Sequence, residues 1–222
     1  MAYILNIETS TKNCSVSIAQ DGNILLCKEI AETGYSHAEK LHVFIEELLL
    51  QLQLKYKDLS AVAVSQGPGS YTGLRIGVSA AKGLCYALNI PLIAVNTLEV
   101  LARQLQISEG FIVPMIDARR MEVYSAVFDA KYQKVRDTAA EIIDDNSFNS
   151  IEGTVYFVGD SAEKGQTVLK QSNFIFKHEI IHPSAKEMGY LSFEKHKKND
   201  TVDVAYFEPL YLKDFMMSTP KK

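Results

Sequence analysis

The sequence predicts an α/β protein of two lobes, each built from a mixed sheet flanked by helices. In the first half, three strand patterns are followed by helix patterns that alternate with strand patterns, the order typical of a mixed α/β lobe. After Gly110 the strand patterns begin again. A length of 222 residues suits one large domain or two small lobes, and 47% hydrophobic residues supply the core. We expect an N-terminal lobe at 1–108 and a C-terminal lobe at 109–222, whose last segment can return to the first lobe.

The elements of the first lobe follow from the spacing of apolar residues. Alternating apolar residues indicate strands, and Asp21-Gly22 is a tight-turn signal between two of them. Apolar residues that recur at three and four positions indicate amphipathic helices. The predicted order is three strands (Tyr3 to Ile7, Ser15 to Ala19, Ile24 to Ile30), a helix (His37 to about Leu54), a strand (Ala61 to Ser65), a helix (Thr72 to Leu88), a strand (Pro91 to Asn96) and a helix (Thr97 to about Gln106).

The second lobe is predicted to be richer in strands. Ser184, with Glu187 three positions later, forms a capping box that predicts a helix toward His196. No internal repeat is evident between the halves of the sequence. The predicted strands are Phe111 to Asp117, Glu122 to Phe128, one that ends before Asp144, Tyr156 to Val158 and Phe174 to Ile181.

Charge and composition narrow the function classes. The formal net charge is -4, and the acidic excess is divided evenly between the halves, so no basic face is available to hold a nucleic acid. No uncharged apolar run approaches the ~20 residues that span a bilayer. The three cysteines (Cys14, Cys27 and Cys85) are an odd number without short spacing, which indicates reduced thiols. We therefore expect a cytoplasmic protein with no membrane contact.

One motif suggests a zinc site. The segment from His178 to His182 matches the H-E-x-x-H pattern of zinc peptidases, in which a helix places both histidines on one ion. Here the apolar residues around the motif favour a strand, and Pro183 places the next helix start after it. On a strand, histidines four apart are ~13 Å apart, whereas both zinc bonds measure ~2.1 Å. We expect no metal site.

A glycine-rich segment after a predicted strand is a second candidate site. Its backbone N–H groups at a helix start would suit a phosphate, but the spacing matches neither the dinucleotide fingerprint nor a Walker loop, so a structural turn is the alternative. Glu8 and Asp117 each end the first strand of a lobe, which would suit Mg-nucleotide binding, although strand-end acids also form turns. The candidate nucleotide-binding residues are Glu8, Thr9, Ser10, Gly67, Gly69, Ser70 and Asp117.

Small residues form a smooth stripe on the second long helix. Gly73, Gly77 and Ala81, flanked by Ala80, recur at four positions despite a cost of ~1 kcal/mol for each helical glycine relative to alanine. Such a stripe lets another helix approach closely. The spacing leaves open whether that helix comes from the same lobe or from another chain.

Several segments resemble the TsaB family, also called YeaZ. The segment Pro209 to Leu212 (PLYL) is similar to that family's C-terminal motif. The other segments are Ile4 to Thr11 (ILNIETST), Gly67 to Gly77 (GPGSYTGLRIG), Ala81 to Leu84 (AKGL) and Ile116 to Tyr124 (IDARRMEVY).

The resemblance implies a two-lobed actin-like fold of the RNase H-like (ASKHA) kind and a role in making threonylcarbamoyladenosine beside the anticodon of tRNA. It implies a non-catalytic subunit that pairs with a TsaD-type catalytic subunit, works with a TsaE-type ATPase, forms a homodimer when alone and meets tRNA only through the complex. It implies no intrinsic cofactor, with ATP or ADP at the complex interface. The expected interface residues, on the two long helices, are Leu41, Ile45, Leu48, Leu49, Gly73, Gly77, Ala80, Ala81 and Leu84.

Departures from the catalytic relatives indicate that this chain has no catalytic residues. Those relatives carry two metal-binding histidines where this chain has Thr97 and Leu101, and leucine cannot coordinate a metal. Lys12 stands where they have a carboxylate. Two alternatives remain. One is an autonomous actin-like ATPase or phosphotransferase that uses Glu8, the Gly67 to Gly73 turn and Asp117, and the other, less favoured, is a glycoprotease-like metallopeptidase.

Overall fold

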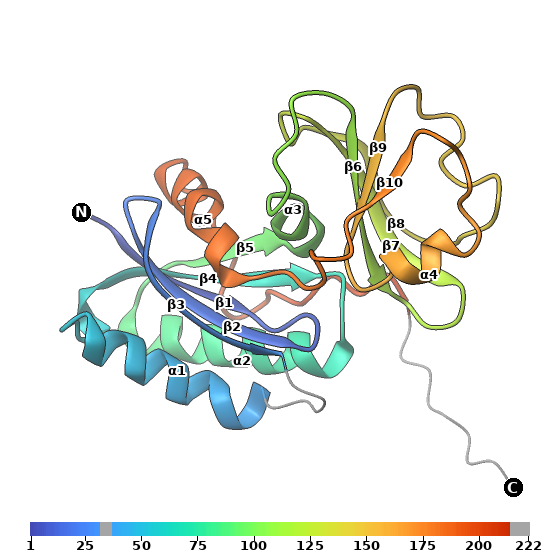
Figure 1. Ribbon diagram of the computed structural model, residues 1–222. Helices are drawn as coiled ribbons and strands as arrows, with labels where there is room; N and C mark the ends of the chain where they lie inside the picture. The colour runs from blue at the N-terminus through green and yellow to red at the C-terminus, as the bar shows by residue number, and fades with distance from the viewer. Residues whose placement is uncertain (32–36, 214–222) are drawn as a thin grey trace, which may run out of the picture.

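The computed structural model describes residues 1–31 and 37–213. In that part of the chain the strands form two sheets of five, one in each lobe (Figure 1). The first sheet contains β1 (Tyr3–Glu8), β2 (Asn13–Gln20), β3 (Asn23–Ala31), β4 (Leu59–Gly67) and β5 (Leu92–Asn96). The second contains β6 (Phe111–Asp117), β7 (Glu122–Asp129), β8 (Lys134–Ile142), β9 (Val155–Val158) and β10 (Phe174–Phe176). The helices are α1 (His37–Gln51), η1 (Tyr56–Asp58), α2 (Tyr71–Leu88), α3 (Thr97–Ala102), α4 (Ala162–Gln166), η2 (Ala185–Glu187) and α5 (Met188–Lys197).

Both sheets have the same topology. The order is β3-β2-β1-β4-β5 in the first sheet and β8-β7-β6-β9-β10 in the second. The central strand of each, β1 or β6, pairs antiparallel with the next strand in the chain and parallel with a later one. This duplicated mixed sheet is the actin-like, RNase H-like arrangement, so the predicted fold class is confirmed.

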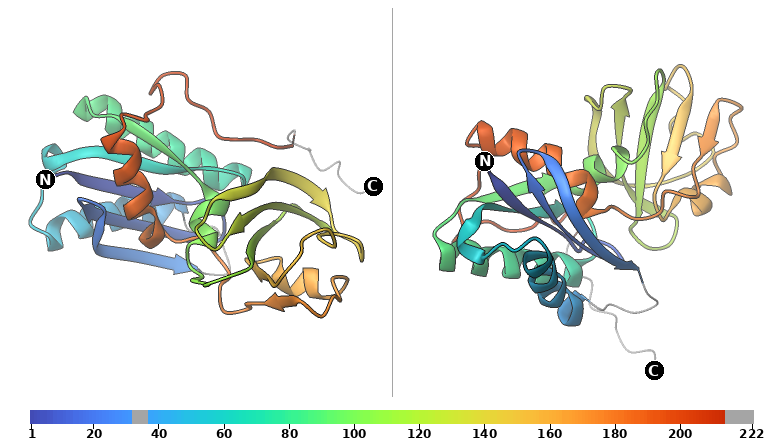
Figure 2. Two further views of the ribbon diagram at one scale, coloured as in Figure 1. Left: turned by 90° about the horizontal axis from the view of Figure 1, so that it is seen from above. Right: turned by 60° about the vertical axis from the view of Figure 1, so that its left-hand side comes forward.

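Helices cover both faces of the first sheet (Figures 1 and 2). On one face α1 and α2 contribute residues such as Ile45 and Val78 to a core shared with Leu5 of β1. On the other face η2 and α5 pack against Ile4 through Met188. Neighbouring residues of β1 enter opposite cores because side chains alternate along a strand. The chain therefore returns to the first lobe at η2 and α5. The sequence predicts this return only for the last segment of the chain.

The short helix α3 lies between the two sheets (Figure 1). Its Val100 packs in the core under α5, whereas Leu98 and Leu101 pack with Phe128 of the second sheet. The Asn96 side chain accepts hydrogen bonds from the first two N–H groups that follow Thr97, at 3.0 and 3.1 Å, and so caps the helix. A single helix therefore belongs to the cores of both lobes.

After α5, residues 202–213 run back along the first lobe; we call them the C-terminal strap. The Leu210 N–H donates to the Gln66 carbonyl at the end of β4, at 2.7 Å. The Lys82 ammonium of α2 donates to two backbone carbonyls of the strap, at 3.1 and 3.0 Å. The strap is therefore fastened to both a strand and a helix of the first lobe.

The clearest differences from the sequence prediction concern three elements. Helix α3 ends at Ala102 rather than near Gln106, and β10 ends at Phe176 rather than at Ile181. The five-residue helix α4 was not predicted, since it is too short to show a helical period.

Within residues 1–31 and 37–213, no helix is both long and apolar enough to cross a membrane.

Candidate functional site

Glu8, at the end of β1, is completely buried. Its carboxylate accepts hydrogen bonds from the Ser10 backbone N–H, at 2.6 Å, and from the hydroxyl of Ser65 in β4. Burial raises the pKa of Glu8, although these hydrogen bonds act in the opposite direction. The carboxyl group is thus enclosed by the chain's own donors and is not open to a ligand.

The glycine loop before α2 packs directly on the turn that follows β1. The Ser70 N–H donates to the Ser10 carbonyl at 2.6 Å, and the Thr9 hydroxyl donates to the Gly73 carbonyl at 2.8 Å. A Cβ atom on Gly69 would lie 2.8 Å from the Ser10 Cβ, which is closer than side chains pack. The Ser70 hydroxyl accepts from the Gly73 N–H at 3.3 Å and caps α2. These contacts support the structural interpretation of the loop.

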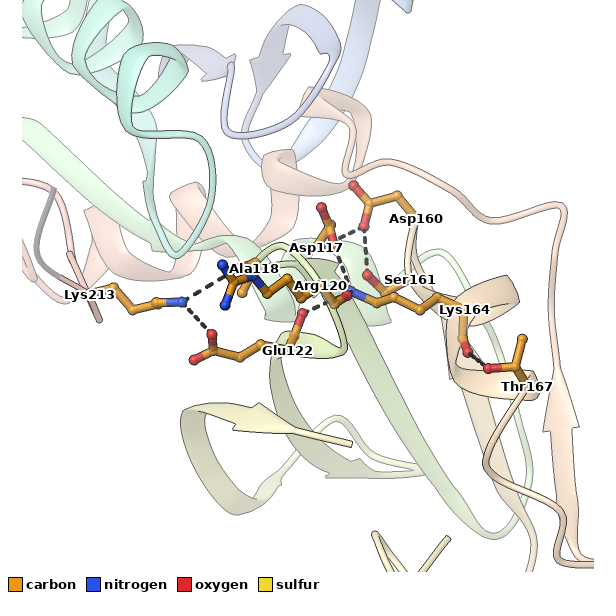
Figure 3. A network of polar contacts seen from close by, with 9 residues as sticks. All are labelled: Asp117, Ala118, Arg120, Glu122, Asp160, Ser161, Lys164, Thr167 and Lys213. Carbon is orange, nitrogen blue, oxygen red and sulfur yellow. Dashed lines mark hydrogen bonds and ion pairs between the residues drawn. The ribbon is translucent and has the colours of Figure 1, made fainter. Parts of the chain in front are cut away.

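The acids of the second lobe lie in a network of polar contacts (Figure 3). Asp117, whose side chain is half exposed, forms an ion pair of 2.5 Å with Lys164 of α4. The Asp117 N–H donates to the Asp160 carboxylate at 2.8 Å. Burial, and to a smaller degree the charge of Asp117, raises the pKa of Asp160 to about 6. Asp117 is therefore already bound to a cation that the chain itself supplies.

Glu8 and Asp117 hold equivalent positions in the two sheets but have different surroundings. One is enclosed by neutral donors, and the other is paired with a lysine. In the described part of the chain, no group of three or more His, Cys, Asp or Glu side chains is placed to hold a metal ion. Each of the two predicted acids is thus engaged by its own partners within the chain.

Thr97 and Leu101, the positions that the resemblance matches to the two histidines of the catalytic relatives, are both completely buried. The Thr97 hydroxyl accepts a hydrogen bond from the Gly67 N–H at 3.1 Å. Leu101 packs in the core between α3 and the second sheet. Both side chains are therefore used to join parts of the fold.

The H-E-x-x-H segment lies in the turn between β10 and η2, so the prediction that it is a strand is wrong. His178 is exposed and stacks on Phe176, and burial lowers the pKa of His182. Neither a helix nor a strand aligns the two histidines. The segment therefore lacks the helical geometry that a zinc peptidase requires.

Most of the predicted interface residues face the chain's own first sheet. A Cβ atom on Gly77 would overlap the Thr9 hydroxyl and lie 3.4 Å from Ile7 of β1. The assignment of this stripe to another chain is therefore corrected: the stripe packs α2 onto β1. Of the predicted set, only Ala80 and Leu84 are partly exposed. The buried members are Leu41, Ile45, Leu48, Leu49, Gly73, Gly77 and Ala81.

The outward faces of α1 and α2 carry exposed apolar and small residues. Val43 and Leu50, two turns apart on α1, are 45% and 79% exposed, and Tyr86 of α2 is 85% exposed. Gly83 of α2 is also exposed, and a Cβ atom there would meet nothing within 4 Å. Figure 1 shows both helices on the same side of the first sheet. We call these four residues the outer helix face; nothing in the described chain covers it.

Asp160 and Lys164 are not among the residues predicted from the sequence. Asp160 follows β9, which runs parallel to β6, so both strands end at the same edge of the sheet as Asp117. An acid just after the predicted strand Tyr156 to Val158 was therefore a usable signal. Lys164 left no such signal, because it lies on a helix of five residues.

Comparisons with known proteins agree with the resemblance to the TsaB family. A family model described as TsaD, tRNA N6-adenosine threonylcarbamoyltransferase, matches residues 31–219. The chain is 31% identical over 219 residues to the tRNA threonylcarbamoyladenosine biosynthesis protein TsaB of Bacillus subtilis, covering 95% of this chain and 93% of that protein. It is 28% identical over 221 residues to the Escherichia coli protein of the same name, covering 95% and 94%. A solved structure of YeaZ from Pseudomonas aeruginosa has the same fold, with a TM-score of 0.85 at 23% identity over 96% of this chain and 100% of that chain.

Proposed function

Because the chain belongs to the TsaB (YeaZ) family, whose members act in the threonylcarbamoyladenosine modification of tRNA, we propose that it is the non-catalytic subunit that binds and supports a TsaD-type catalytic subunit. In this proposal the partner transfers threonylcarbamoyl to the adenosine beside the anticodon. The chain itself supplies a binding surface and no reacting group.

The state of Thr97 and Leu101 is the observation that carries the non-catalytic assignment. Both side chains are completely buried, and the Thr97 hydroxyl is bonded to the backbone of Gly67. The two positions that the resemblance matches to metal-binding histidines therefore carry side chains that hold α3 in place. A leucine offers no donor atom to a metal.

The outer helix face is the surface that we assign to the TsaD-type partner. Val43, Leu50 and Tyr86 expose apolar area that no other part of the described chain covers. Gly83 adds a point of close approach, since its helical position costs ~1 kcal/mol relative to alanine and gains no contact within this chain. A partner helix seated on Gly83 would supply that missing contact. The same surface would serve for self-pairing when the partner is absent.

The remaining parts of the complex follow from the same proposal. A TsaE-type ATPase joins the complex, and ATP or ADP binds at its interfaces rather than in this chain alone. The enclosure of Glu8 and the ion pair of Asp117 support this, because both candidate acids are already engaged. The net charge of -4 supports contact with tRNA only through the complex. We place the complex in the cytoplasm.

The decisive experiment reconstitutes the transfer reaction. This chain is co-expressed with the TsaD-like protein of the same organism, and transfer to tRNA is measured with and without it. We expect transfer to depend on both chains and this chain alone to be inactive. Transfer by this chain without the partner, or full activity of the partner without it, would refute the assignment.

A matched pair of variants tests the surface. Leu50→Glu places a charge on the outer helix face, and Ile142→Glu makes the same change on the second lobe, where Ile142 is 73% exposed. Both should fold, because both side chains are exposed. Leu50→Glu should weaken binding to the partner at least about tenfold, as at an apolar contact, and Ile142→Glu should not. Equal binding by both variants would place the interface elsewhere.

A further inference from the structure

The ammonium group of Lys164 is surrounded by three oxygen atoms of one turn (Figure 3). It donates to the Asp117 carboxylate at 2.5 Å, to the Arg120 carbonyl at 2.8 Å and to the Glu122 carbonyl at 2.9 Å. Asp117 ends β6, Arg120 lies in the turn that follows and Glu122 begins β7, whereas Lys164 comes from α4. A single positive charge is therefore held by a carboxylate and two backbone carbonyls.

The backbone of the turn has an unusual conformation. Arg119 and Arg120 both have left-handed backbone angles, with φ of 73° and 56°. Two successive non-glycine residues in this region are rare. The turn closes tightly, since the Glu122 N–H donates to the Arg119 carbonyl at 3.2 Å. In this conformation the Arg120 and Glu122 carbonyls and the Asp117 carboxylate all contact the same ammonium group.

The same set of oxygen atoms suits a hard divalent cation. Carboxylate and carbonyl oxygens are the ligands that calcium and magnesium prefer in proteins. A second carboxylate is adjacent, since Asp160 accepts a hydrogen bond from the Asp117 N–H. On the other side of the turn Lys213 pairs with Glu122 and donates to the Ala118 carbonyl at 3.4 Å. Lysine side chains thus neutralise both acids of the turn itself.

We propose that the Lys164 ammonium occupies a latent site for a hard divalent cation, formed by the Asp117 carboxylate and the carbonyls of Arg120 and Glu122, and keeps metal out of it. The ammonium is compact and is tethered through α4, so it neutralises the carboxylate without any ion from solution. A magnesium ion that used Asp117 would first have to displace Lys164. The inference does not rest on the proposed function, because it concerns this chain alone.

Replacing Lys164 should open the site. Lys164→Met keeps the length of the side chain and removes the charge, and Lys164→Gln keeps a hydrogen-bond donor as a milder second variant. The matched control is Lys170→Met, which removes the same charge from an exposed lysine on the same segment. In a fourth variant Lys164→Met is combined with Asp117→Asn, which removes the carboxylate ligand.

Terbium provides the readout, because tyrosine can sensitise its luminescence and Tyr124 pairs with Ile116 beside the turn. The four variants and the wild type are titrated with terbium and then with competing calcium. We expect both Lys164 variants to bind one terbium ion at least about tenfold more tightly than Lys170→Met, since they lose a positive charge in contact with the ligand atoms. The wild type and the double variant should match the control.

Two outcomes would overturn the proposal: Lys164 variants that bind no better than Lys170→Met, or a wild type that binds as tightly as they do. Binding that survives Asp117→Asn would also refute it, because the ligand set would then be a different one. If neither Lys164 variant folds in metal-free buffer, refolding is repeated with calcium. Recovery of the native circular dichroism spectrum would support the site, and failure to recover would count against it.

Discussion

Two glycines of α2 allow a direct test of which helix face packs inside the chain. Gly77→Ala and Gly83→Ala introduce the same methyl group into the same helix, so the gain in helix propensity, about 0.5–1 kcal/mol, is common to both. At Gly83 the methyl group meets nothing within 4 Å. At Gly77 it overlaps the hydroxyl of Thr9, which is itself hydrogen-bonded to Gly73. Overpacking of this kind costs typically ~1–3 kcal/mol.

The difference in unfolding free energy between the two variants therefore measures the cost of the steric overlap at Gly77 alone. We expect Gly83→Ala to be more stable than the wild type and to be more stable than Gly77→Ala by ~1–3 kcal/mol in urea unfolding. For a chain of this size each kcal/mol corresponds to roughly 2–4 °C in Tm. Equal shifts in both variants would refute the packing of Gly77 on β1. A destabilised Gly83→Ala would show that Gly83 has an internal contact.

Two further predictions concern single polar groups. Burial raises the pKa of Asp160 from 3.8 to about 6, so the folded protein binds this proton more tightly than the unfolded chain does. The free energy of unfolding should therefore decrease as the pH rises from about 4 to about 6 and the carboxyl group ionises. Asp160→Asn keeps an oxygen acceptor for Asp117 and should be more stable than the wild type at pH 7, by up to ~3 kcal/mol, with no such advantage at pH 4 in urea unfolding. An equal advantage at both pH values would show that the burial of this charge is not the cause. Lys82→Met removes the donor to the carbonyls of Ala205 and Phe207 and should speed amide hydrogen exchange in the C-terminal strap about tenfold. Unchanged exchange there would mean that other contacts hold the strap.

Local periodicity was sufficient to predict most of the first lobe. Leu41, Ile45 and Leu48 recur at helical spacing, and all three face the sheet. The sheet order itself was not accessible, because it depends on pairings between residues far apart in the chain. The topological repeat of the two sheets also left no recognisable sequence repeat, since the fold is defined by strand order and not by particular side chains.

The glycine stripe shows where spacing alone is insufficient. Gly77 and Gly83 are six residues apart, which at about 100° per residue places them on clearly different faces of the helix. Spacing separates the two faces but does not say which one meets the sheet. That depends on Thr9, which lies close to Gly77 only after β1 and α2 have packed. The role of Lys164 could not be predicted from spacing for the same reason, because its three hydrogen-bond partners are far from it in the sequence.

The position of α3 has a mechanical consequence. Val100 is part of one lobe's core, and Leu98 and Leu101 are part of the other's, so rotation of one lobe against the other would expose apolar area on at least one side of the helix. The two lobes should then unfold in one cooperative transition. A partner bound to α1 and α2 would then lie at a fixed distance and angle from the second lobe, without touching it, so the chain fixes the geometry between whatever binds its two lobes.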